Sequence, residues 1–132
     1  MVKRPFTAAP KAMWAGLQPG VTVLVDTAPW IYLLEDHESF APLFLGLFEA
    51  AERGQLQLAL TTLTVAEVLT GPLRAKQTTL AKRYEKALNR YQVVPMSAAI
   101  ASLAAQLRVQ YRLKLPDAVQ LASALSIEAS AL

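Results

Sequence analysis

The stretch VTVLVDTAPW, residues 21–30, decides the fold, because it leads from a buried strand into a helix through a carboxylate. Residues 21–25 are apolar and mostly β-branched, which is typical of a central parallel strand covered on both faces. The following PWIYLL, residues 29–34, predicts a short helix with Pro29 in its first turn. Asp26 lies between the two. It either caps the helix or belongs to a site whose other members lie farther along the chain.

The rest of the chain alternates between strand patterns and helix patterns. Further strands are predicted at residues 55–62 and 91–96, and helices at 39–53, 64–71, 75–90, 97–111 and 115–125. Gly54 is expected to end the helix before it, and Gly71 with Pro72 the helix at 64–71. Alternation of this kind predicts an α/β fold with a parallel sheet and helices on both faces.

Length and composition restrict the possible classes of protein. The chain has 132 residues, of which 54% are hydrophobic, so we expect one globular domain at 21–132 after an irregular lead-in at 1–20. It has no cysteine and a single histidine, His37, which argues against disulfides, thiolate sites and multi-histidine metal sites. No apolar run is long enough to span a membrane, no secretory signal is indicated, and the absence of cysteine is compatible with a reducing cytosol, so we expect a cytoplasmic protein. The net charge of +3 permits a polyanionic partner.

Three carboxylates are candidates for a common site. Asp26 ends the first strand, Glu67 lies in what is predicted to be the first turn of the helix after the second strand, and Asp117 begins the last helix. Ligands of parallel α/β sheets bind at the carboxyl ends of the strands, so the three are expected to meet there. Oxygen ligands without histidine or cysteine suit Mg²⁺ or Mn²⁺, which can activate water for phosphodiester hydrolysis.

Each acid also has a purely structural explanation. Asp26 could only cap a helix, and Asp117 after Pro116 could be an ordinary helix start. Thr64 and Glu67 fit a capping box, in which the glutamate reaches back to a backbone N–H group. Their shared position at one edge of the sheet favours a site, because capping does not require it.

Three motifs together identify a family resemblance. VLVDTAPWIYLL, TTLTVAEVLTGP and LKLPDAVQLASAL, in this order and spacing, resemble a PIN domain, and most of all the VapC-type toxins of bacterial toxin–antitoxin pairs. The resemblance implies a three-layer α/β/α sandwich and a ribonuclease that depends on Mg²⁺ or Mn²⁺. It implies an RNA substrate, an inhibitory antitoxin and a homodimer. It also implies that Asp26, Glu67 and Asp117 bind the metal, and that Thr27 orients Asp26 or a bound water.

The C-terminal end departs from the family pattern. PIN domains normally continue after the last helix with a final strand and a fourth acidic residue, whereas this sequence reads SIEASAL up to Leu132. We therefore expect the domain to be truncated at this end, without its final strand. Glu128 follows Asp117 by 11 residues, about 16 Å along a helix, and is not an obvious substitute. An alternative function is thus a PIN-like module that binds RNA or an antitoxin without cleaving.

Two groups of residues are candidates for contact with these partners. Arg108, Arg112 and Lys114 precede Asp117 and are predicted to bind RNA phosphates. The basic helix at 75–90 is interpreted either as an RNA-binding face or as a solvated outer surface. The apolar residues Trp30, Tyr32 and Leu33 are predicted to contact an antitoxin or a second subunit, or else to pack onto the sheet.

Overall fold

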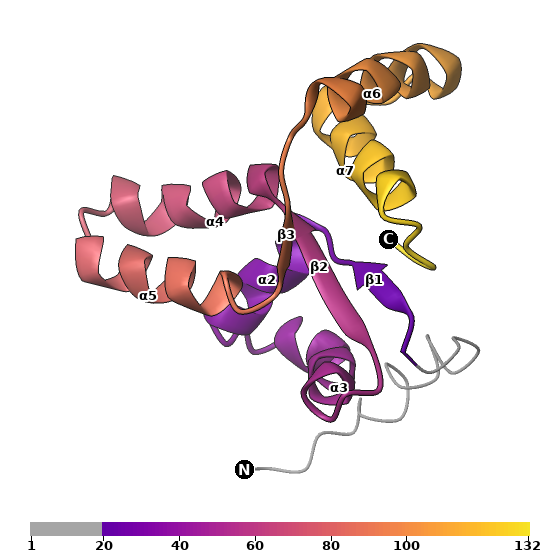
Figure 1. Cartoon of the computed structure of the whole chain (residues 1–132). Coiled ribbons are helices and arrows are strands. Elements are labelled where there is room, and N and C mark those ends of the chain that lie inside the picture. Colours follow the sequence, from indigo (N-terminus) through magenta and orange to yellow (C-terminus); the bar gives the residue numbers. More distant parts are fainter. Residues whose placement is uncertain (1–19) are drawn as a thin grey trace.

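The structure is a computed structural model that describes residues 20–132, so the predicted lead-in lies outside the described residues except for Gly20. The described part is an α/β fold, as predicted (Figure 1). Its elements, in chain order, are β1 (Thr22–Leu24), α2 (Thr27–Leu34), α3 (Ala41–Glu52), β2 (Gln57–Thr61), α4 (Thr62–Arg74), α5 (Thr78–Leu88), β3 (Gln92–Val94), α6 (Ala98–Tyr111) and α7 (Leu115–Ser126).

The three strands form one parallel sheet in the order β1-β2-β3. Val23 pairs with Leu58, and Leu60 pairs with Val93. All three strands therefore end at the same edge of the sheet. The helices that follow β1 and β2 begin at that edge.

Alternate residues of the strands point to opposite faces of the sheet, and both faces are covered. Val23 and Leu58 pack with residues of α2 and α3 on one face, whereas Leu24 and Ala59 pack with α6 and α7 on the other. Figure 1 shows the α6–α7 pair on one side of the strands and α2 and α3 on the other side. This confirms the predicted three-layer sandwich, and burial on both faces explains why the strands are so uniformly apolar.

Helix α4 is longer than predicted. It continues through Gly71 and Pro72 to Arg74, and Pro72 lies inside the helix with its side chain buried. Proline lacks an N–H group, so this position gives up the bond that would otherwise reach the carbonyl of Val68. The ladder resumes directly afterwards, since Ala75 N donates to Gly71 O at 3.1 Å. The predicted end at Gly71 and Pro72 was therefore wrong. The longer α4 and α5 form a pair that extends beyond the sheet (Figure 1).

After α7, the structure shows a single bridge to the sheet rather than a further strand. After α7 the chain returns to β1, where Ser130 N donates to Thr22 O at 2.9 Å and Leu24 N donates to Ala131 O at 3.1 Å. Val23 and Ala131 form a parallel bridge. This bridge lies on the side of β1 that does not face β2. Among residues 20–132, no helix combines the length and the apolar character that crossing a membrane requires.

Candidate metal site at the carboxyl edge of the sheet

Asp26 occupies the turn between β1 and α2. It is the N-cap residue of α2, and its Oδ1 accepts a hydrogen bond from Thr27 N at 2.7 Å. The same Oδ1 accepts a second bond, at 2.8 Å, from Nε2 of Gln120 on α7. The cap and the tertiary contact thus share one carboxylate oxygen.

Glu67 does not form the capping box that its sequence suggested. The N-cap of α4 is Thr61, whose Oγ1 accepts from Thr64 N at 3.1 Å, so the helix begins three residues earlier than the box requires. Glu67 therefore lies in the second turn of α4 rather than the first. Its Oε1 instead accepts a hydrogen bond of 2.7 Å from Thr27 Oγ1. The capping box was the wrong interpretation.

Thr27 connects the two acids through separate groups. Its backbone N–H donates to Asp26, and its hydroxyl donates to Glu67. The hydroxyl also lies 2.9 Å from Oγ1 of Thr64. Thr27 thereby ties the first turn of α2 to α4 directly beside Asp26.

Gln120 is a residue of this site that the sequence analysis missed. Its side chain is buried, with 2% of its surface exposed, although it is polar. Besides the bond to Asp26, its Nε2 donates to Thr64 Oγ1 at 2.9 Å, and its Oε1 accepts from Thr61 Oγ1 at 2.9 Å. The available signal was its position in LPDAVQLASAL, one turn after Asp117 and among residues that are otherwise apolar or small.

Asp26 and Asp117 line a common hollow of about 300 Å³. Asp117 lies in the first turn of α7, as predicted. The other lining residues are Leu113, Gln120, Leu121 and Leu132. Glu67 is not among them, and within residues 20–132 no three acidic or histidine side chains are grouped closely enough to hold a metal ion. The three predicted acids therefore share an edge of the sheet but do not converge on a single point.

The predicted phosphate-binding residues surround the turn between α6 and α7. Arg108 lies in the last turn of α6, Arg112 is its C-cap with a left-handed φ of 55°, and Lys114 is the N-cap of α7. All three side chains are exposed. Leu113, between the last two, lines the hollow. Arg112 and Lys114 are thus the direct chain neighbours of a residue in the wall of the candidate site.

Trp30 packs in the core, which is the second of its two predicted environments, and it offers no surface to a partner. Only 1% of its surface is exposed, its Nε1 donates to Val25 O at 3.1 Å, and its ring contacts those of Phe48 and Tyr91 edge-on. It is a core residue because the indole fills the space between the sheet and α3. Tyr32 and Leu33 are half-buried.

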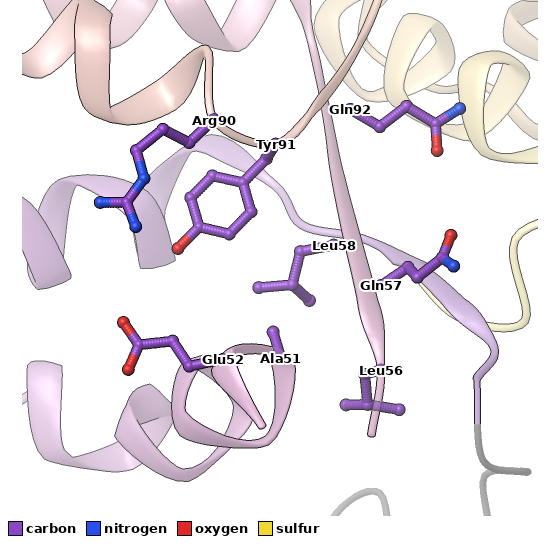
Figure 2. A pocket seen from close by; sticks show the side chains of 8 residues that line it. All are labelled: Ala51, Glu52, Leu56, Gln57, Leu58, Arg90, Tyr91 and Gln92. Carbon is purple, nitrogen blue, oxygen red and sulfur yellow. The ribbon is translucent and has the colours of Figure 1, made fainter. Parts of the chain in front are cut away.

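A second hollow, of about 350 Å³, lies at the opposite edge of the sheet, where β2 and β3 begin (Figure 2). Glu52 and Arg90 extend toward each other beside the ring of Tyr91 (Figure 2). Burial raises the pKa of the Tyr91 hydroxyl above 10.0, the negative charge of Glu52 raises this pKa further, and Arg90 opposes both effects. None of the predicted site residues lines this hollow.

Comparison with known proteins identifies a family and a fold. The profile of the PIN domain matches residues 23–132. Among solved structures, a toxin–antitoxin complex from Klebsiella pneumoniae is 29% identical with a TM-score of 0.65, covering 83% of this chain and 82% of that chain. VapBC2 from Rickettsia felis, bound to a DNA fragment from its promoter, is 16% identical with a TM-score of 0.66, covering 83% and 84%, and supports the fold alone. No curated protein matches the sequence.

Proposed function

The chain belongs to the PIN domain family, and from this membership we propose that it is a metal-dependent endoribonuclease, the toxin of a toxin–antitoxin pair. The observation that carries the proposal is that Asp26 and Asp117 line one hollow while Glu67 is tied to the same turn through Thr27. Carboxylates repel one another, so a hollow lined by two of them favours a cation.

The donor set of this hollow fits a hard divalent cation. Mg²⁺ is commonly held by one or two carboxylates, while waters and substrate phosphates complete its shell. Asp26 and Asp117 would hold Mg²⁺ or Mn²⁺, and Glu67 is the nearby third carboxylate. When bound, such an ion lowers the pKa of a coordinated water and stabilises negative charge on a phosphodiester.

The remaining residues of the site have roles in orientation and substrate binding. Thr27 fixes Asp26 through its backbone N–H and Glu67 through its hydroxyl. Arg108, Arg112 and Lys114 contact the RNA backbone, which is supported by their exposure around the turn that precedes Asp117. Phosphate contacts of this kind hold RNA without reading its sequence.

The partners belong to the same proposal. The solved Klebsiella pneumoniae structure is a toxin–antitoxin complex and is 29% identical, which supports a cognate antitoxin. We also propose a cytoplasmic location. We propose a homodimer, with Tyr32 and Leu33 as the remaining candidates for contact with the antitoxin or the second subunit, because both are only partly buried.

One observation favours a second function. Within residues 20–132 the acids form no group of three with metal-ligand spacing. A PIN-like module that binds RNA or an antitoxin without cleaving it would need no such group. Cleavage, rather than binding, therefore distinguishes the two functions.

The test is cleavage of a labelled single-stranded RNA by the purified chain with Mg²⁺ or Mn²⁺. Asp26→Asn removes one metal-binding charge at nearly constant shape, and Asp36→Asn is the matched control, because Asp36 lies in an exposed turn with a left-handed φ of 51° that asparagine tolerates. We expect cleavage by the wild type and by Asp36→Asn, and none by Asp26→Asn or with EDTA. A contaminating ribonuclease would cleave equally in both variants. RNA binding without cleavage in the wild type would establish the second function.

A further inference from the structure

Three polar side chains are buried directly behind the carboxylates of Asp26 and Glu67, which Thr27 links. They are Thr61 at the end of β2, Thr64 in α4 and Gln120 in α7, with exposed fractions of 1%, 0% and 2%. Buried polar groups are costly unless they are hydrogen-bonded. Each of the three has at least two partners, so the group is a complete network rather than a packing defect.

The orientation of the Gln120 amide follows from its neighbours. The carboxylate of Asp26 only accepts hydrogen bonds, so the NH₂ end of the amide must face it. The second hydrogen of Nε2 then goes to Thr64 Oγ1, and Oε1 accepts the hydroxyl of Thr61. A flipped amide would place two acceptors against each other at 2.8 Å.

The direction of the hydroxyl groups follows in turn. Glu67 accepts the hydrogen of the Thr27 hydroxyl, so Thr27 Oγ1 acts as the acceptor toward Thr64 at 2.9 Å. Thr64 already accepts from Gln120 and has its own hydrogen to donate to Thr27. One chain of donors thus runs from Gln120 through Thr64 and Thr27 to Glu67. A second, direct bond runs from Gln120 to Asp26.

We infer that Gln120 is a positioning residue that holds the carboxylate of Asp26 ready for a metal ion in the hollow, and that its donor chain through Thr64 and Thr27 fixes Glu67 beside that site. An amide does not titrate in the physiological range, so Gln120 Nε2 stays a donor to Asp26 and to Thr64. Within the described part of the chain, the bonds to Asp26 from Thr27 N and Gln120 Nε2 both end on Oδ1, which leaves Oδ2 as the oxygen for a cation. The inference rests on the proposed function only in taking the carboxylates as metal ligands.

Groups that orient metal ligands from behind are worth about 10–100-fold in metal affinity. The direct test is therefore the Mn²⁺ affinity of the full chain, measured by titration calorimetry, together with unfolding in urea. Gln120→Leu removes the donors at similar volume, and Gln106→Leu, on the exposed side of α6, is the matched control. We expect Mn²⁺ to bind about 10–100-fold more weakly to Gln120→Leu and with wild-type affinity to Gln106→Leu.

The outcomes separate this inference from the proposed function. Wild-type Mn²⁺ affinity in a folded Gln120→Leu protein would overturn the inference and leave the nuclease proposal intact. No Mn²⁺ binding by the wild type would overturn both. A loss of stability in urea without a change in Mn²⁺ affinity would mean that Gln120 serves the fold alone.

A measurement on the wild type decides the question even if Gln120→Leu does not fold. The side-chain NH₂ signals of Gln120 in a ¹⁵N NMR spectrum report its contact with Asp26 directly. We expect them to shift when Mg²⁺ is added and in Asp26→Asn. Signals that respond to neither change would overturn the inference.

Discussion

Replacing Thr64 by valine gives the sharpest prediction about the buried polar network. Valine has nearly the shape of threonine but lacks the hydroxyl, and Thr64 is completely buried. The substitution leaves the second N–H of Gln120 without an acceptor, whereas Thr27 keeps its bond to Glu67. One orphaned buried donor costs about 1–3 kcal/mol, so we expect a loss of about 2 kcal/mol in the free energy of unfolding.

The expected shift in melting temperature follows from the size of the chain. An unfolding entropy of about 2.1 cal/mol/K per residue over 132 residues gives about 0.28 kcal/mol/K. A loss of 2 kcal/mol should therefore lower Tm by about 7 °C. Circular dichroism during heating measures this shift, and unfolding in urea gives the free energy independently.

Thr70→Val is the matched control, because Thr70 lies on the same helix but is exposed. Its hydroxyl donates to Ala66 O at 2.7 Å, and water can replace that bond. We expect a change within about 0.5 kcal/mol. If Thr64→Val costs no more than Thr70→Val, the network does not stabilise the fold and the assigned direction of its hydrogen bonds is wrong.

Three further predictions concern charge. The pKa of Tyr91 is raised in the folded state, so the unfolded state ionises first as the pH rises. The contribution of Tyr91 to the free energy of unfolding should therefore be fully present below pH 10 and decline above it. Tyr91→Phe should lessen this decline when unfolding in urea is measured at pH 9 to 11. Replacing Arg112 and Lys114 together by glutamine should weaken the binding of single-stranded RNA and reduce the slope of the logarithm of the binding constant against the logarithm of the salt concentration by about 1.4. Replacing one exposed arginine and one exposed lysine of α5 by glutamine should have a smaller effect. Asp26→Ala removes both the cap and the acceptor of Gln120 and should lose at least about 1 kcal/mol of stability, whereas Asp26→Asn keeps an acceptor oxygen for both bonds; equal stability of the two variants in urea would argue against a stabilising role of these bonds.

The order of strands and helices was predictable because the sheet is buried on both faces. The run VTVLV is apolar at four of its five positions and mostly β-branched, which favours a buried strand over an amphipathic helix. Two features escaped prediction for tertiary reasons. Pro72 is a helix breaker by local chemistry, yet α4 continues because that position is packed in the interior. The pairing of Ser130 and Ala131 with β1 involves too few residues to produce a strand pattern.

The site was predictable only as far as topology places residues at one edge. In the sequence TTLTVAE either Thr61 or Thr64 could be the N-cap of the helix, with Glu67 as the partner of Thr64 in a capping box. The choice depends on where β2 ends, which is at Thr61. For Gln120 the sequence offered only a weak signal, its position one turn after Asp117, because a single polar residue in a helix is normally exposed. Its burial depends on the sheet face that α7 covers.

The two explanations of Asp26, a helix cap and a member of a site, are not alternatives. The cap fixes the carboxylate through the backbone of α2, and Gln120 fixes the same oxygen from α7, about 94 residues away in the chain. With the cap alone, the carboxylate could still turn toward water. Without the cap and the bond from Gln120, binding a metal ion would have to order the side chain at a cost in conformational entropy. Among residues 20–132 both bonds end on Oδ1, so these contacts supply rigidity and leave Oδ2 to the cation that we propose. A strand that is mostly buried can therefore end on a carboxylate, since the fold uses one oxygen and the proposed metal site would use the other.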